Sequence, residues 1–174
     1  MPIEPDTKDW TWVLHERCPE CGFDPLEVDR DDLGRRIRHA AAAMHQRLHG
    51  EAVAERPDDA TWSPLEYAAH VRDVCGVMET RLHQLLHEDD PEFANWDQDR
   101  AAVDGDYASQ DPEHVAAALD LAAASLANAA DAVPTDAWDR TGRRSNGSVF
   151  TVRTLLEYAL HDLEHHAFDV TRAR

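Results

Sequence analysis

Apolar residues recur every three or four positions in four stretches of the chain, a spacing typical of amphipathic helices. The first stripe follows two aspartates suited to a helix N-terminus and predicts a helix over residues 29–50. Residues 63–66, Ser-Pro-Leu-Glu, supply an N-cap, a proline at the first helical position and a capping-box glutamate, so we expect a second helix over 63–87. A third helix is predicted over 111–131 and a fourth from 151 into the C-terminal stretch.

The connection between the second and third predicted helices, residues 88–111, has no sustained period and is long for a helical hairpin. Such a length indicates a crossover between helices that are not simple antiparallel neighbours. Asn146-Gly147 predicts a tight turn or small hairpin before the last helix. The pattern favours an all-α fold, a four-helix bundle with a long crossover between helices two and three.

The first part of the chain does not share this helical pattern. Residues 1–28 contain two tryptophans in a short apolar stretch and the sequence CPECG at 18–22. We predict that they form an N-terminal extension with a cysteine knuckle that wraps a surface, while residues 29–174 form the bundle. At 174 residues the chain is long enough to bury one core, so we expect one compact unit.

Charge narrows the classes of partner. The chain carries 35 acidic and 17 basic residues, a formal charge of −18, spread along its length. Such a charge repels phosphate backbones and anionic lipid, so we expect neither nucleic-acid nor membrane-surface binding. The first ten residues lack the basic and apolar regions of a signal peptide, and no apolar run is long enough to span a bilayer. Three cysteines suit a reducing cytoplasm, which is the location we expect. We expect a small molecule as the substrate. A homodimer stays possible.

Metal-ligating side chains are concentrated in the last predicted helix. It offers two pairs spaced four residues apart, His161 with His165 and Asp162 with His166, and the members of each pair would lie one turn above each other. The expected buried face is formed by Val152, Leu156, Ala159, Leu163 and Val170. Periodicity places Asp162 and His166 at the edge of this face, whereas the other pair projects away from the bundle.

The second predicted helix adds His70 to this set. One ligand from one helix and a pair from a facing helix is an arrangement by which bundles hold metal ions. Three protein ligands leave a coordination position for water or substrate, as in catalytic metal sites. A lone histidine near a core is often merely hydrogen-bonded, but so many imidazoles and carboxylates against an apolar face would be costly without a cation. We therefore predict an open site formed by His70, Asp162 and His166.

The segment 62–73, WSPLEYAAHVRD, resembles the opening of the second helix in the DinB-like superfamily of metalloenzymes. The resemblance implies that His70 is a metal ligand. The family's last helix carries a pair of ligands four residues apart, with Gln or Asp three residues after the second ligand. His166, followed by Asp169, fits that second ligand and implies Asp162 as the first, where the family usually has His or Glu. The alternative register, which uses the other two histidines, stays open.

The resemblance covers about residues 30–171 and also carries functional expectations. Similarity to the family's thiol-dependent members implies a divalent metal, zinc, that binds a low-molecular-weight thiol such as mycothiol for transfer or isomerisation. Hydrolysis by a metal-activated water is the nearest variant. The alternative from another class is a non-catalytic bundle that binds metal structurally and serves as an interaction or stress-response module.

Three further residues are predicted near the open site. Asp73 lies one turn beyond His70 and is spaced to hydrogen-bond to its imidazole. Trp96 and Asp97 lie in the long crossover, where loops tend to carry substrate contacts. All three are expected to support the site or to contact its substrate.

The cysteine knuckle allows two interpretations. Cys18 and Cys21 form half of a zinc-ribbon signature, and the sequence has no second pair with this spacing. They could simply pack in a turn or form a redox pair. Alternatively, they join His161 and His165 in a closed zinc site of two cysteines and two histidines, which would staple the extension to the outer side of the last helix.

Overall fold

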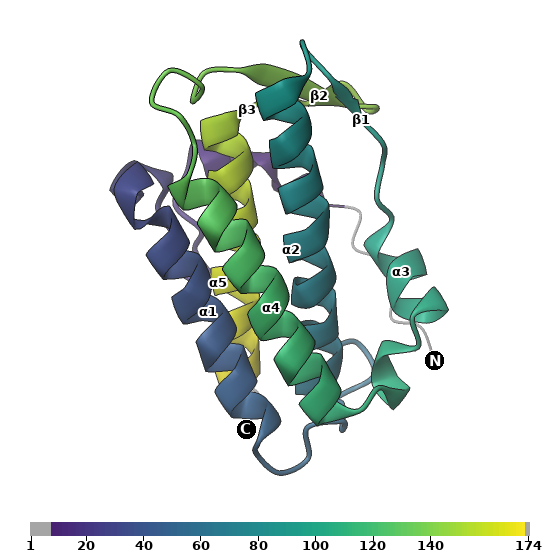
Figure 1. Cartoon of the computed structure of the whole chain (residues 1–174). Coiled ribbons are helices and arrows are strands. Elements are labelled where there is room, and N and C mark those ends of the chain that lie inside the picture. The colour runs from purple at the N-terminus through teal and green to yellow at the C-terminus, as the bar shows by residue number, and fades with distance from the viewer. Residues whose placement is uncertain (1–7, 173–174) are drawn as a thin grey trace.

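Figure 1 shows the computed structural model, which describes residues 8–172 and contains five α-helices and one three-stranded sheet within that range. Four long helices form a bundle: α1 (Leu33–Leu48), α2 (Pro64–His87), α4 (Pro112–Asp131) and α5 (Val152–Arg172). Helices α1 and α2 each pack mainly against α4 and α5, so α1 and α2 lie at opposite corners. The predicted helical bundle is therefore confirmed, whereas the division of the chain at residue 28 stays a prediction.

Capping signals define where α2 begins. The Ser63 hydroxyl accepts a hydrogen bond from the backbone N–H of Glu66 (3.3 Å), and the Glu66 carboxylate accepts one from the N–H of Ser63 (2.9 Å). This capping box sets the register in which His70 faces the interior. Helix α1 begins later than predicted, at Leu33, because a 3-10 turn (Arg30–Asp32) precedes it.

The crossover is more structured than its sequence indicates. Residues 88–111 contain strand β1 (Glu92–Phe93), helix α3 (Gln98–Asp104) and a 3-10 turn (Tyr107–Ser109). In Figure 1 this segment runs back alongside α2, so that α4 starts at the same end of the bundle as α2 and the two helices run parallel. The segment thereby lies close to the face of α2 that carries His70.

A small sheet covers one end of the bundle. Strand β1 pairs in parallel with β2 (Thr141–Arg144), and β2 pairs antiparallel with β3 (Val149–Thr151). The hairpin predicted at Asn146-Gly147 is thus the β2–β3 turn, in which Gly147 has a φ of +93°, a value that glycine adopts readily. Helix α5 follows β3 directly, so the sheet anchors the helix that carries both candidate metal pairs.

The N-terminal extension crosses the outer side of α5. Within the described residues it forms two 3-10 turns, Trp10–Leu14 and Pro25–Glu27, and the first of them packs against α5. The knuckle between them is a tight turn: the N–H of Cys18 donates to the carbonyl of Phe23 (2.8 Å), and the N–H of Gly22 donates to the carbonyl of Cys18 (2.9 Å). Gly22 has a φ of +81°, in the left-handed region that favours glycine.

The buried face predicted for the last helix is confirmed, because its five apolar residues are all at most 1% exposed: Val152, Leu156, Ala159, Leu163 and Val170. His161 and His165, which were expected to project away from the bundle, are nevertheless only 3% and 7% exposed. The extension buries them: the ring centroid of Trp10 lies 5.6 Å from that of His161 and 5.2 Å from that of His165.

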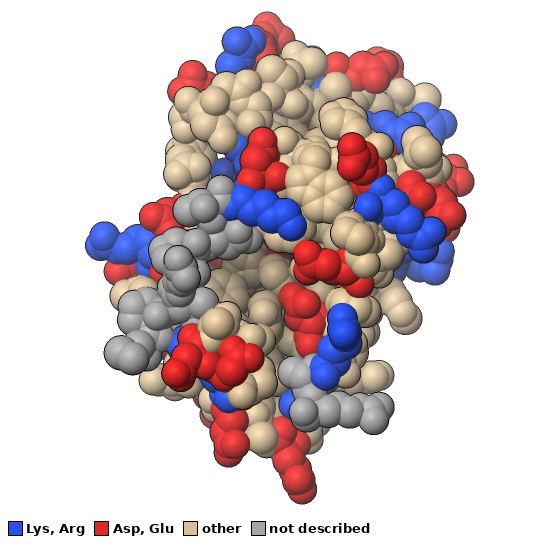
Figure 2. Space-filling view, turned by 180° about the vertical axis from the view of Figure 1, so that it is seen from behind, with Lys and Arg blue, Asp and Glu red and all other residues tan. Residues whose placement is uncertain are grey.

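Charged side chains are dispersed over the surface. Figure 2 shows acidic side chains spread over the face opposite to the view of Figure 1, with basic side chains between them. On this face the acidic charge is therefore not gathered into one patch. No helix within residues 8–172 is both long and apolar enough to cross a membrane.

Candidate metal centres on helix α5

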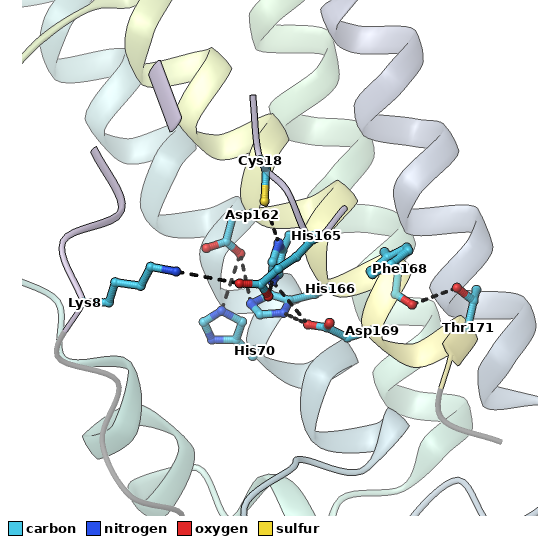
Figure 3. Close-up of polar contacts among 10 residues, drawn as sticks. Lys8, Cys18, His70, Asp162, His165, His166, Phe168, Asp169 and Thr171 are labelled. Carbon is cyan, nitrogen blue, oxygen red and sulfur yellow. Dashed lines mark hydrogen bonds and ion pairs between the residues drawn. The ribbon is translucent and has the colours of Figure 1, made fainter. Parts of the chain in front are cut away.

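The open cluster joins one side chain of α2 to two side chains of α5. Nε2 of His70 lies 3.5 Å from Oδ1 of Asp162, and Nε2 of His166 lies 3.8 Å from the same oxygen. All three candidate ligand atoms lie within 4.8 Å of one another. Ligand atoms bound to one tetrahedral zinc ion stand about 3.4 Å apart, so the cluster has nearly the required spacing. Figure 3 shows both imidazoles directed at the Asp162 carboxylate.

Buried polar atoms of this cluster lack hydrogen-bond partners among the described residues. They are both ring nitrogens of His70, which is fully buried, and Oδ1 of Asp162. Each such atom costs about 1–3 kcal/mol when nothing compensates its desolvation. Burial acts to raise the pKa of Asp162, but its contact with His70 and the neighbouring histidines lower it to about 2, so the side chain is a carboxylate at neutral pH. Two imidazoles and a carboxylate fit a divalent metal, which would pair with these atoms.

Asp169 orients the ring of His166. Its Oδ2 lies 3.0 Å from Nδ1 of His166 and accepts a hydrogen bond when that nitrogen carries the proton. Nε2 of the same ring then presents its lone pair toward Asp162, which is the tautomer that a metal ligand needs. The same Asp169 oxygen lies 3.8 Å from Nε2 of His165, so this carboxylate stands between the two histidine pairs.

Trp96 and Asp97, the two crossover residues predicted near the open site, differ in whether they contact it. Trp96 lies against the open cluster, with its ring stacked on that of His70 at a centroid distance of 5.6 Å and an interplanar angle of 22°. Asp97 is exposed and caps α3, where it accepts a hydrogen bond from the N–H of Arg100 at 2.9 Å. Of these two side chains, Trp96 is therefore the one in contact with a candidate ligand.

The prediction that Asp73 hydrogen-bonds to His70 is wrong. The Asp73 carboxylate accepts hydrogen bonds from the Tyr107 hydroxyl and from Nε of Arg72. The spacing along α2 is suitable, but the crossover brings Tyr107 to Asp73 and thereby occupies the carboxylate. Asp73 thus ties the crossover to α2 rather than orienting His70.

A cavity of about 340 Å³ adjoins the open cluster, and Asp162 and His166 form part of its wall. Other side chains in this wall come from the extension, from the start of α2 and the residue before its cap, from α3 and from α5: Trp10, Glu20, Trp62, Tyr67, Asp99 and Asp169. Tyr67 lies three residues before His70 on α2, so a helical projection could have indicated it, whereas Trp62 lies before the N-cap of the helix. No sequence signal indicated Trp10 or Glu20, because only the path of the extension brings them to the cavity.

The closed cluster joins the cysteine knuckle to the outer side of α5. One ligand atom from each of Cys18, Cys21, His161 and His165 lies within 4.8 Å of the others. Sγ of Cys18 is 3.7 Å from Nδ1 of His165, a contact visible in Figure 3. The structure thus brings together the four side chains that spacing alone had suggested, although they come from parts of the chain more than a hundred residues apart.

Burial sets the protonation of the closed cluster. It lowers the pKa of His161 to about 4 and also lowers the pKa of His165, so both rings are neutral at pH 7. Burial raises the pKa of Cys21 to about 12, so this thiol keeps its proton unless a cation displaces it. Neutral imidazoles are ready to bind a metal, whereas the thiols would release protons on binding.

Comparisons with known proteins agree with this architecture. The sequence model of the DinB superfamily matches residues 33–168, and the chain belongs to that superfamily. Its structure is similar to that of YfiT from Bacillus subtilis, described as a probable metal-dependent hydrolase with an unusual four-helix bundle topology. The TM-score is 0.73 at 17% identity, over 86% of this chain and 92% of the YfiT chain, so the likeness shows a shared fold. No curated protein matches the chain significantly.

Proposed function

We propose that this protein is a metal-dependent enzyme that holds one divalent metal, zinc, through His70, Asp162 and His166. The observation that carries the proposal is the convergence of these three groups beside a cavity, where buried polar atoms of His70 and Asp162 have no hydrogen-bond partner among the described residues. Membership of the DinB superfamily and the description of YfiT as metal-dependent support it. The free state of the three cysteines suits the reducing cytoplasm, which we propose as its location.

The protein side chains around this site would hold and shape it. Asp169 keeps a proton on Nδ1 of His166, and Trp96 packs on the ring of His70, so both imidazoles are fixed in direction. Trp62 lies with its ring centroid 5.2 Å from that of His70 and helps to exclude water from the inner side. A divalent metal with an open coordination position would lower the pKa of a thiol or water that binds to it.

A low-molecular-weight thiol is the proposed nucleophile, with mycothiol as the candidate, for a transfer or isomerisation reaction. The resemblance to the DinB-like superfamily, which includes thiol-dependent members, supports this choice, and so does the lining of the cavity. The carboxylates of Glu20, Asp99 and Asp169 can accept hydrogen bonds from the hydroxyl groups of a sugar-containing thiol, and the rings of the tryptophans can pack on its sugar faces. Water in place of the thiol would make the enzyme a hydrolase.

Cobalt substitution can test the thiol directly. The variant Cys18→Ser/Cys21→Ser removes the two thiols of the knuckle, and the remaining Cys75 is buried with a pKa raised to about 12 by burial. Mycothiol added to this cobalt-loaded variant should produce a sulfur-to-cobalt absorption band, and a further His70→Ala substitution should abolish it. A bound cobalt ion that shows no such band while the protein hydrolyses esters or amides would favour the hydrolase. A cobalt ion with only protein ligands and no exchangeable water would favour a non-catalytic module.

A further inference from the structure

We propose that Cys18, Cys21, His161 and His165 bind a second zinc ion in a closed site that fixes the N-terminal extension to α5. This site is separate from the open cluster and does not depend on the reaction proposed for it. Two thiolates and two imidazoles are a donor set that structural zinc sites use, and they complete a tetrahedron without a position for substrate. The assignment rests on three features of the described residues: spacing, an unpartnered buried nitrogen and the shape of the knuckle.

The spacing of the cluster fits one tetrahedral ion. Zinc lies about 2.3 Å from a thiolate sulfur and about 2.0 Å from an imidazole nitrogen, so sulfur and nitrogen ligands stand about 3.5 Å apart. Sγ of Cys18 and Nδ1 of His165 are 3.7 Å apart, and all four ligand atoms lie within 4.8 Å of one another. Side chains brought together only by packing have no reason to direct four donor atoms at one point.

The second feature is Nε2 of His161. This nitrogen is buried and has no hydrogen-bond partner among residues 8–172, and the whole residue is only 3% exposed. The rings next to it belong to Trp10 and Phe23, with centroids 5.6 Å and 5.3 Å away, and their faces and edges do not replace a strong partner. A buried imidazole with an unpartnered nitrogen beside two thiols therefore fits a metal ligand.

The third feature is the turn that carries the cysteines. The hydrogen bonds from Cys18 N–H to Phe23 and from Gly22 N–H to Cys18 close the chain on itself, and the positive φ of Gly22 makes the turn tight. The turn places both sulfurs on the side that faces α5. Buried side chains such as Phe23 and Val28 also hold the extension against the bundle, and a zinc ion would add a fixed link from the turn to α5.

The closed zinc site would also affect the cavity, because the extension forms part of the cavity wall. Trp10 and Glu20, carried by the extension, form part of the cavity wall, and Trp10 packs on the rings of both histidines of the closed cluster. Zinc in the closed site would therefore keep this wall in place without taking part in the binding of the metal at the open site. Loss of the closed-site zinc is expected to loosen the wall without removing the metal of the open site.

Zinc counts on the full-length protein test the inference. The zinc-loaded wild type should hold two ions per chain, Cys21→Ser should hold one, and Cys75→Ala, which changes the cysteine outside the cluster, should still hold two. His70→Ala should also hold one, so loss of either site can be recognised separately. A wild type that holds one ion, retained in Cys21→Ser and lost in His70→Ala, would overturn the closed site. Two ions retained in Cys21→Ser would overturn it as well.

Two measurements keep the test decisive if a substitution disturbs folding. Cobalt-loaded His70→Ala, which retains the knuckle, should show the absorption of tetrahedral cobalt with thiolate ligands, and a spectrum without thiolate bands would count against the site. Trypsin provides the second measurement, because Arg17 is exposed next to Cys18. Zinc should slow cleavage after Arg17 in the wild type but not in Cys21→Ser; equal rates with and without zinc in the wild type would contradict the staple.

Discussion

The two clusters occupy the same two turns of α5 but are built differently. Both clusters border the cavity, but the open cluster takes its third ligand from α2 inside the bundle, whereas the closed cluster takes two thiols from the extension and is covered by aromatic rings. Along α5 the pairs are offset by one residue, His161 and His165 against Asp162 and His166. Since successive residues on a helix point about 100° apart, an offset of one position is enough to direct each pair to a different partner.

The ligand atoms of the two clusters also differ. Two imidazoles and one carboxylate leave a coordination position open and permit exchange, whereas two thiolates and two imidazoles fill a tetrahedron. An ion in the open cluster should therefore be removed by chelators more readily than one in the closed cluster. Substitutions that affect one site and spare the other can test this difference.

The largest effect is expected from His70→Ala. The open site then has two ligands in place of three, and its zinc affinity should fall by more than about 100-fold, with a matching loss of turnover. The closed site should keep its ion. Equilibrium dialysis and zinc analysis measure both, and His83→Ala, an exposed histidine on the same helix, is the matched control. Survival of the open-site ion in His70→Ala would contradict the ligand assignment.

Removal of the closed-site zinc is expected to have the next largest effect, on stability. In the His70→Ala background, chelation of the remaining ion should lower the free energy of unfolding by about 4 kcal/mol, as for a ligand present at about 1,000 times its dissociation constant. For a chain of 174 residues this corresponds to a fall in Tm of roughly 10 °C. Calorimetry with and without chelator measures the change, and an unchanged Tm would argue against a structural ion.

Asp169→Asn tests how the open site is supported. Asparagine keeps the size of the side chain but replaces the carboxylate that accepts the hydrogen bond from Nδ1 of His166. Zinc affinity at the open site should fall by about 10- to 100-fold. Competition with a coloured chelator measures the affinity. An unchanged affinity would show that His166 does not need Asp169 to hold its ring.

Trp10→Ala tests the link between the staple and the cavity. Its ring lines the cavity and packs on both histidines of the closed cluster, so its removal should weaken substrate binding without changing the zinc count. Loss of one aromatic contact worth about 1 kcal/mol predicts a KM raised about fivefold with kcat nearly unchanged. A kcat that falls with KM constant would instead place Trp10 in the chemistry.

The smallest effect is expected from Glu164→Gln. Glu164 lies on α5 among the four candidate ligands, but its carboxylate accepts hydrogen bonds at 2.8 and 2.7 Å from Arg36 of α1. The substitution should lower the free energy of unfolding by about 1 kcal/mol and leave both zinc sites filled. Denaturant titration and zinc analysis measure the two effects. Loss of an ion would show that position 164 contributes to a site.

Local signals were sufficient for most of the bundle. The capping box at Ser63 and Glu66 and the apolar stripe of α5 depend on neighbours within a few residues, and both are present as expected. The short elements of the crossover, among them β1 and α3, gave no signal because they are too brief to show a period and depend on tertiary contacts.

The sites show the same limit of local reasoning. Helical spacing separated the two pairs on α5, and the structure places each pair with a different set of partners. The same spacing failed for Asp73, whose carboxylate is taken by Tyr107 from the crossover. It also did not reveal the burial of His161 and His165, because the extension that covers them is distant in sequence. Contacts between remote segments, rather than periodicity, decide such details.

The most direct test of two metal sites on one helix is anomalous scattering from a zinc-loaded crystal at the zinc absorption edge. Two peaks are predicted per chain. One should lie among His70, Asp162 and His166 with a coordination position that the protein does not fill, and the other among the two cysteines, His161 and His165. A single peak shared by histidines of both pairs, or no peak beside the cysteines, would contradict the account.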